Sequence, residues 1–212
     1  MNVLGLTGGI ACGKTAVARL FMARGVPVVD ADAVARDVVA PGTDGLAAVV
    51  AAFGDEVLAP DGTLDRQRLG AKVFSDEAAR RTLNGILHPR IGAESMARLA
   101  ALSAEGHGFA FYDAALLVEN GLHRNFAGLV VVTARPEVQL ARLMERDDIT
   151  EAEARARIAS QWPIERKVAV ATHVIDNSGT REALAARVDE VFAALVREHG
   201  APARRSEGAT DG

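Results

Sequence analysis

The feature that most constrains this chain is a glycine-rich segment close to its amino terminus. Residues 8–15 read GGIACGKT, which matches G-x-x-x-x-G-K-[ST] without a gap. The apolar run Val3–Thr7 before it has the length of a strand, and a helical pattern follows. Strand, glycine turn and helix in this order predict a phosphate-binding loop, where backbone N–H groups and a helix amino terminus hold phosphate oxygens. The alternative, a chance glycine turn, does not require these flanks.

Three side chains of this loop suggest specific chemistry. Lys14 is expected to reach the β- and γ-phosphates of a nucleotide, and the hydroxyl of Thr15 is expected to hold Mg²⁺. Cys12 is either an oxidisable thiol, its pKa lowered by the helix terminus, or a small residue whose backbone faces the phosphate. We favour the second interpretation, because nothing else in the sequence indicates redox chemistry.

Composition narrows the class of protein. The chain has 212 residues with 24 basic and 28 acidic side chains, a net charge of −4, and no basic block, which disfavours nucleic acid or an anionic membrane as a partner. The longest stretch without Asp, Glu, Lys or Arg is Met1–Gly13, shorter than the roughly 20 residues that span a bilayer. A single cysteine indicates a reducing compartment. We therefore predict a cytoplasmic protein without a signal peptide.

Five short apolar runs of strand length recur along the chain, separated by helical patterns. They are Val3–Thr7, Val26–Asp30, Phe109–Asp113, Leu129–Ala134 and His173–Asp176. Several are continuously apolar, as in strands buried on both faces of a parallel sheet. The alternation predicts an α/β, three-layer fold of the P-loop nucleoside-triphosphate hydrolase type with a five-stranded parallel sheet.

Other segments lie outside this minimal pattern. A final helix is predicted by the apolar spacing of Leu184, Val188, Val191, Phe192 and Leu195. The stretches 31–108, mainly helical, and 136–163, rich in arginine, are interpreted as insertions, and Thr150 and Glu153 have the spacing of a capping box. The tail, residues 200–212, is predicted to be disordered.

Two carboxylates follow the second predicted strand. In an open parallel sheet, ligands collect at the carboxyl ends of strands, so Asp30 or Asp32 is a candidate general base. Either one is equally suited to cap the next helix, and both roles are compatible because a cap needs only one carboxylate. Arg36, four residues after Asp32, is placed to pair with it or to reach a substrate phosphate.

Further charged residues are candidates with two interpretations each. Asp113 ends the third strand, either as an acid that orients Mg²⁺ through water or as an ordinary strand-terminal acid, and Glu119 is a further acid for the same cleft. Arg142 and Arg146 lie one helical turn apart. They suit either a lid that closes over ATP or an exposed helix paired with its neighbouring acids.

The motifs disfavour a GTPase switch. The chain has no N-K-x-D sequence, and its D-x-x-G sequence, Asp176–Gly179, lies at the last strand, too late for a γ-phosphate contact. Arginines, a phosphate loop and a carboxylate base are the arrangement that kinases use.

Several motifs in order resemble the dephospho-CoA kinase family, whose members phosphorylate the ribose 3′-hydroxyl of dephospho-CoA in the last step of CoA biosynthesis. They are LTGGIACGKT (6–15), VDAD (29–32) with Arg36 after it, LHP (87–89), LLVEN (116–120), RLMERDD (142–148) and VIDNSG (174–179). The phosphate loop is generic, whereas its combination with VDAD, LHP and LLVEN is specific. The family usually has Gly and Ser where Ala11 and Cys12 stand, and often a proline at the position of Ala115.

The resemblance implies a role for each matched residue. Asp32 is implied as the catalytic base, assisted by Lys14 and Arg142. The ATP site is implied at Gly8, Gly9, Ala11, Cys12, Gly13, Lys14, Thr15, Ala16, Arg142, Arg146 and Asn177. The dephospho-CoA site is implied at Asp32, Arg36, His88, Leu116 and Glu119. Without the family, His88 followed by Pro89 is better interpreted as a structural turn.

The resemblance also implies three parts. They are a nucleotide-binding core of residues 1–30, 109–135 and 168–199, a helical CoA-binding part of residues 31–108, and a lid of residues 136–167. Two other functions stay open: a kinase of a different small hydroxyl acceptor, and a nucleotide-sensing module without turnover. The oligomeric state is open as well.

Overall fold

The computed structural model describes residues 1–74 and 76–203, which form two compact units. One unit is residues 30–100, and the other comprises the described residues on either side of it. In chain order the elements are β1 (Asn2–Gly8), α1 (Lys14–Ala23), β2 (Val28–Asp30), α2 (Ala31–Asp37), α3 (Asp44–Phe53), η1 (Asp55–Val57), α4 (Arg66–Phe74), α5 (Glu77–Ala104), β3 (Phe109–Asp113), η2 (Leu122–Asn125), β4 (Leu129–Thr133), α6 (Pro136–Asp147), α7 (Glu151–Ala159), α8 (Ile164–Val168), β5 (His173–Asp176) and α9 (Arg181–His199).

The five predicted strands form one sheet in the order β2-β3-β1-β4-β5. β1 runs parallel to β3 and to β4, and β4 runs parallel to β5. The predicted α/β fold with a five-stranded parallel sheet is therefore confirmed. β1 lies in the middle of the sheet, so the loop that follows it emerges between the ends of β3 and β4, where a ligand can be surrounded by loops from several strands.

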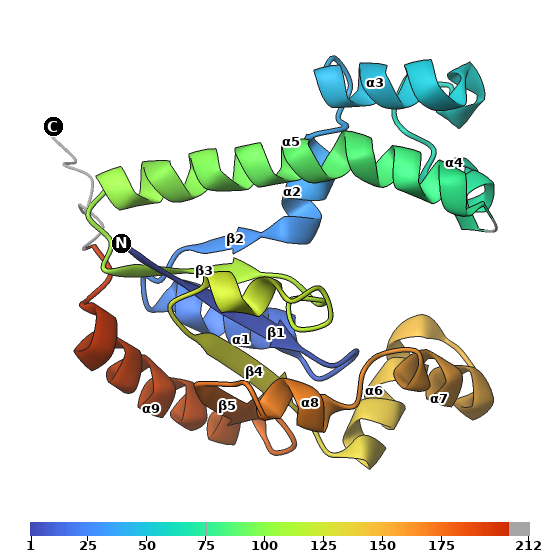
Figure 1. Ribbon diagram of the computed structural model, residues 1–212. Helices are drawn as coiled ribbons and strands as arrows, with labels where there is room; N and C mark the ends of the chain where they lie inside the picture. The colour runs from blue at the N-terminus through green and yellow to red at the C-terminus, as the bar shows by residue number, and fades with distance from the viewer. Residues whose placement is uncertain (75, 204–212) are drawn as a thin grey trace, which may run out of the picture. The chain divides into compact units, whose positions relative to one another are not determined.

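The main core lies where α1 and α9 pack on one face of this sheet (Figure 1). The predicted last helix is confirmed: Leu184, Val188, Val191 and Leu195 are buried, and Phe192 packs at the edge of the cluster. A second cluster, centred on Leu117, Val118, Leu129 and Val131, joins the segment after β3 and the start of α8 to β4. Apolar packing from both clusters thus fixes the loops at the carboxyl ends of the strands.

The unit of residues 30–100 is helical and has its own core, built around Val39, Leu46, Val49, Val57 and Leu69. The interpretation of His88 and Pro89 as a turn is wrong, because both lie inside α5. Proline leaves the carbonyl four residues earlier, that of Gly85, without a helical donor. Gly85 and Pro89 are both exposed, so this carbonyl faces solvent and the helix continues at a modest cost.

The helices α6 and α7 fall within the predicted lid, residues 136–167, and α8 ends one residue beyond it. The predicted capping box is confirmed: the Thr150 side chain accepts a hydrogen bond from the Glu153 N–H, and the Glu153 carboxylate accepts one from the Thr150 N–H at 2.9 Å. This exchange fixes the start of α7 after the left-handed turn at Asp148.

The end of the chain is described as far as residue 203. The Gly108 N–H donates to the Ala201 carbonyl at 3.0 Å, and the Ala203 N–H donates to His107 Nδ1 at 3.1 Å. The start of the predicted disordered tail is thus hydrogen bonded, and its remainder, 204–212, lies outside the described residues. Along the described chain, helices long enough to cross a bilayer are all too polar to do so.

The packing of Phe111 between α1 and the sheet makes its removal costly. Its ring is fully buried and lies 4.7 Å from the ring of Phe21 between centroids. We expect Phe111→Ala to lower the free energy of unfolding by about 3–5 kcal/mol in urea denaturation, because it leaves a cavity. Phe74, 85% exposed, is the matched control, and Phe74→Ala is expected to stay within about 0.5 kcal/mol of the parent. Equal losses would contradict this assignment of the core.

Candidate active site

The glycine-rich segment forms a tight loop between β1 and α1. Gly13 precedes α1 with φ of 88°, a left-handed conformation that favours glycine, and a Cβ there would collide with the amide of Asn177. At Gly8, a Cβ would lie 2.6 Å from the Val132 carbonyl oxygen of the neighbouring strand. Ala11 also has a positive φ, 56°, which explains why related loops favour glycine at this position.

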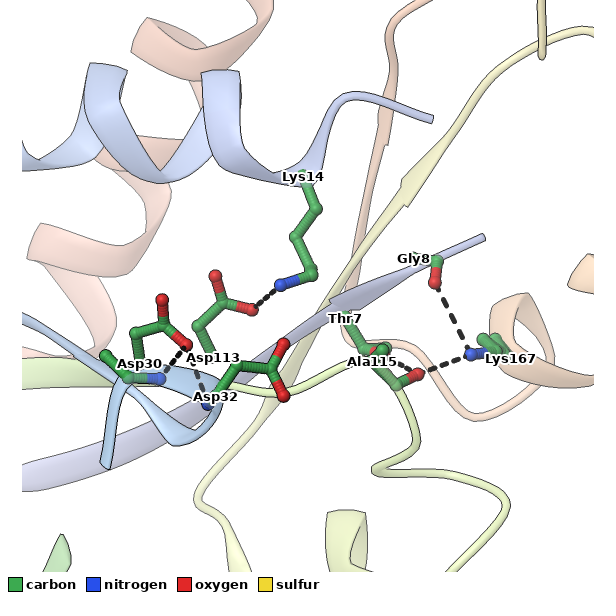
Figure 2. Close-up of polar contacts among 9 residues, drawn as sticks. Thr7, Gly8, Lys14, Asp30, Asp32, Asp113, Ala115 and Lys167 are labelled. Carbon is green, nitrogen blue, oxygen red and sulfur yellow. Dashed lines mark hydrogen bonds and ion pairs between the residues drawn. The ribbon is translucent and has the colours of Figure 1, made fainter. Parts of the chain in front are cut away.

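The loop presents its cation beside a strand-terminal acid. Lys14 Nζ forms an ion pair with Asp113 Oδ1 at the end of β3 (Figure 2). Asp113 is nearly buried, whereas Lys14 keeps 18% of its side chain exposed. The two residues, predicted separately from different strands, are thus brought together. Thr15 and Ala16 follow in the first turn of α1 and are exposed, where N–H groups of a helix lack helical partners.

Two glutamines that the sequence did not single out hold the loop from the predicted lid. The Ile10 N–H donates to Gln161 Oε1 at 2.8 Å, and the Ile10 carbonyl accepts from Gln139 Nε2 at 2.6 Å. Both main-chain polar groups of Ile10, which belong to two adjacent peptide units of the phosphate loop, are therefore held by side chains. No sequence motif marks these glutamines, since the contacts span more than a hundred residues.

Asn177 and Arg142 lie against the other end of the loop. The buried Asn177 side chain donates from Nδ2 to the Cys12 carbonyl at 2.9 Å, and the main-chain carbonyl of Asn177 accepts from Arg142 Nη1 at 2.9 Å. The amide of Asn177 thus holds the phosphate loop. Arg146 is exposed instead and makes two hydrogen bonds to Asp147, at 2.7 and 3.1 Å, which raise the pKa of its guanidinium.

The two carboxylates after β2 have different surroundings. Asp30 caps α2: its Oδ1 accepts from the N–H groups of Asp32 and Ala33 at 2.8 and 3.2 Å (Figure 2). Asp32 is exposed, and within the described chain nothing forms a hydrogen bond or ion pair with its carboxylate. Arg36 is exposed as well and does not pair with Asp32, although the two are four residues apart on α2. Asp30 is therefore the cap of α2, and the role of general base stays a prediction.

The remaining predicted residues differ in exposure. His88 is exposed on α5, in the unit of residues 30–100, and Leu116 is 46% exposed after β3. Glu119 is largely buried, and its Oε1 lies 2.8 Å from Nζ of Lys167, a fully buried lysine that the motifs did not indicate. Only the composition could have drawn attention to Lys167, because the chain has only three lysines.

The metal donors at the loop fit Mg²⁺ shared with a nucleotide. Residues 1–74 and 76–203 contain no group of three or more His, Cys, Asp or Glu side chains placed to hold a metal ion. Mg²⁺ commonly takes one or two protein oxygens together with substrate phosphates and water. The Thr15 hydroxyl and the Asp113 carboxylate are such donors, one at the start of α1 and one beside Lys14.

Known proteins resemble this chain along most of its length. A family model described as dephospho-CoA kinase matches residues 2–182. The dephospho-CoA kinase of Anaeromyxobacter dehalogenans is 52% identical, covering 92% of each chain, and that of Streptomyces avermitilis is 48% identical over 98% of this chain and 100% of the relative. The crystal structure of TT1252 from Thermus thermophilus superposes with a TM-score of 0.78 at 31% identity, over 92% of this chain and 97% of that one.

Backbone conformation predicts opposite effects at two loop positions. Ala11→Gly is expected to stabilise the protein by up to about 1 kcal/mol, because relief of a left-handed alanine exceeds the added chain entropy. Gly13→Ala is expected to cost at least about 1–2 kcal/mol and to weaken ATP binding, because the methyl group displaces Asn177. Urea denaturation and calorimetric ATP titration measure both. A stabilising Gly13→Ala would contradict this geometry.

The environment of Cys12 predicts an unreactive thiol. Burial raises the pKa of Cys12, outweighing hydrogen bonds from the Gly9 and Ala134 backbone that lower it. A raised pKa keeps more of the thiol protonated near neutral pH, so the rate of its reaction with a disulfide reagent is expected to keep rising with pH beyond the ordinary thiol pKa of about 8.5. At pH 8 the native protein should react at least about ten-fold slower than the urea-unfolded protein. Equal rates would favour the redox interpretation.

Proposed function

The chain belongs to the dephospho-CoA kinase family, and on that premise we propose that it transfers the γ-phosphoryl group of ATP to the ribose 3′-hydroxyl of dephospho-CoA. The observation that carries the proposal is the phosphate loop with its lysine beside Asp113, in a chain whose match to that family spans residues 2–182. Both substrates are small polyphosphorylated molecules, and such ligands are bound by backbone N–H groups and cationic side chains.

ATP is held by the loop and by arginines of the lid. Backbone groups of residues 8–16 surround the β- and γ-phosphates. Lys14 Nζ leaves Asp113 and binds these phosphates. Arg142, already hydrogen bonded next to the loop, neutralises charge on the transferring group. Arg146 also binds phosphate, by exchanging its hydrogen bond to Asp147 for one to a phosphate oxygen. Asn177 shapes this end of the ATP site because its side chain holds the Cys12 carbonyl.

Asp32 accepts the proton of the acceptor hydroxyl. The hydroxyl oxygen bonds to the γ-phosphorus, the bond from phosphorus to the β,γ-bridging oxygen breaks, ADP leaves and the proton passes to Asp32. The support for Asp32 over Asp30 is the cap: Asp30 already accepts two N–H groups, whereas the Asp32 carboxylate is exposed. Asp32 also directly follows β2, a strand of the sheet that carries the phosphate loop.

Arg36, His88, Leu116 and Glu119 form the acceptor site. The exposed guanidinium of Arg36 is available for a phosphate of dephospho-CoA, and the exposed Leu116 offers apolar contact. Residues 31–108 serve as the CoA-binding part and residues 136–167 as the lid, while residues 1–30, 109–135 and 168–199 form the nucleotide-binding core. The protein acts in the cytoplasm, in keeping with its single cysteine.

Mg²⁺ is the proposed metal cofactor, held by the Thr15 hydroxyl and, through water, by Asp113. When bound, it supplies charge neutralisation between the β- and γ-phosphates. The chain's own contribution is to keep a hydroxyl at the start of α1 and a carboxylate at the end of β3.

The reaction is tested by ADP release with Mg-ATP, with and without dephospho-CoA. We expect strong stimulation by dephospho-CoA, and Asp32→Asn is expected to lower kcat by about 10²- to 10⁴-fold while ATP binding persists, because the proton acceptor is lost. Asp30→Asn is the matched control, since asparagine caps a helix about as well as aspartate, and it should retain most activity.

Each contrary result has a definite meaning. Stimulation by a different hydroxyl acceptor, without stimulation by dephospho-CoA, would favour another small-molecule kinase. ATP binding without turnover on any acceptor, unchanged by Asp32→Asn, would favour a nucleotide-sensing module. A collapse in Asp30→Asn with an active Asp32→Asn would exchange the two roles.

A further inference from the structure

Lysine is scarce in this chain and its placement is informative. Of 24 basic residues only three, Lys14, Lys72 and Lys167, are lysines. Lys14 belongs to the phosphate loop, and Lys72 lies on the exposed surface of α4, paired with Glu56 at 2.8 Å. Lys167, by contrast, has no exposed side-chain surface. A buried ammonium is rarely retained without specific partners, so its contacts indicate what it does.

The ammonium of Lys167 is surrounded by three oxygen atoms. Nζ lies 2.7 Å from the Ala115 carbonyl and 3.4 Å from the Gly8 carbonyl (Figure 2). It also lies 2.8 Å from Glu119 Oε1. An ammonium has three N–H donors that can diverge toward three separate acceptors. The planar guanidinium of arginine is larger and directs its donors within one plane, so it does not reproduce this arrangement in a fully buried space.

These three oxygens belong to the two segments that the reaction must align. Gly8 is the first residue of the phosphate loop, whereas Ala115 and Glu119 follow β3 and its terminal Asp113. The hydroxyl of Thr7 also donates to the Ala115 carbonyl, at 2.9 Å. Lys167 itself comes from α8, at the end of the lid. One side chain thus joins the lid, the phosphate loop and the segment after β3.

Lys167 is also the counter-charge of a buried acid. Both carboxylate oxygens of Glu119 are inaccessible to solvent and lack a well-aligned hydrogen bond, so the ion pair with Lys167 at 2.8 Å is what compensates their charge. An uncompensated carboxylate here would be costly to bury and would repel polyphosphate ligands. The lysine therefore fixes the position of Glu119 and cancels its charge.

We propose that Lys167 is a positioning residue for the acceptor site, which binds Glu119 and the Ala115 turn to the first residue of the phosphate loop. This proposal rests on the proposed function, because it takes Glu119 as part of the dephospho-CoA site. Lys167 touches neither substrate. It acts through Glu119 and through the peptide of Ala115, whose carbonyl it shares with Thr7.

The test separates binding of the two substrates. Lys167→Met keeps an unbranched side chain, shorter by the terminal atom, and removes the charge and the N–H donors. It is expected to raise KM for dephospho-CoA by about ten- to a hundred-fold and to change KM for ATP by less than about three-fold. The reason is that Lys167 contacts Ala115 and Glu119 more closely than Gly8 of the phosphate loop. Lys167→Arg should not restore KM. Lys72→Met is the matched control, with an ion pair of the same length on the surface, and both KM values should stay within about two-fold.

A double variant asks whether Lys167 acts through Glu119. If it does, Lys167→Met combined with Glu119→Gln raises KM for dephospho-CoA no further than the larger single effect. Multiplied effects, equal changes in both KM values, or no change in Lys167→Met would overturn the proposal while the wild type stays active. Absence of dephospho-CoA turnover in the wild type would instead overturn the proposed function.

A measurement on the wild-type protein covers the case in which Lys167→Met does not fold. In an NMR spectrum of protein labelled with ¹³C at the ε-carbon of lysine, three signals are expected. The signal that disappears in Lys72→Arg belongs to Lys72, the one lost on titration with ATP belongs to Lys14, and the third belongs to Lys167. Dephospho-CoA alone should shift the Lys167 signal and leave that of Lys72 in place. A Lys167 signal that ignores dephospho-CoA would overturn the proposal.

Discussion

A loop that binds phosphate through its backbone cannot be stabilised by the groups it offers to the ligand, so its other polar groups must be held from outside. In this chain four such supports come from distant parts of the sequence. Gln161 and Gln139 hold the N–H and the carbonyl of Ile10, Asn177 holds the Cys12 carbonyl, and Lys167 approaches the Gly8 carbonyl. All four supporting side chains come from residues 139–177, so the elements from α6 to β5 serve as the scaffold that brings them to the loop.

The sequence predicted the elements that local patterns control. Strand positions follow from apolar runs, the start of α7 from its capping box, and the loop from a motif whose glycines have positive φ or close neighbours. His88 and Pro89 were misinterpreted because proline penalises a helix locally, whereas an exposed carbonyl tolerates the missing bond. The choice between Asp30 and Asp32 also needed the structure, since both have the residue type and position of a cap.

The supports of the loop escaped prediction for a different reason. Gln139, Gln161 and Lys167 lie in segments whose local patterns describe only amphipathic helices, and their partners are more than a hundred residues away or on another element. Local periodicity carries no information about such pairs. The composition of the chain does carry information about Lys167. In a chain that otherwise uses arginine, a lysine indicates a position where a compact ammonium fits better than a guanidinium.

The distribution of charge shows how a chain with a net charge of −4 can receive polyanions. The acids beside the loop are each neutralised by a cation: Asp113 by Lys14, and Glu119 by Lys167. Arg142 differs, because the hydrogen bond that holds it goes to the neutral carbonyl of Asn177, and across the described residues it forms no ion pair. Its guanidinium is therefore oriented without being neutralised. A cation held in this way keeps both its charge and most of its five N–H donors for a phosphate, which is the requirement for stabilising charge that develops during transfer.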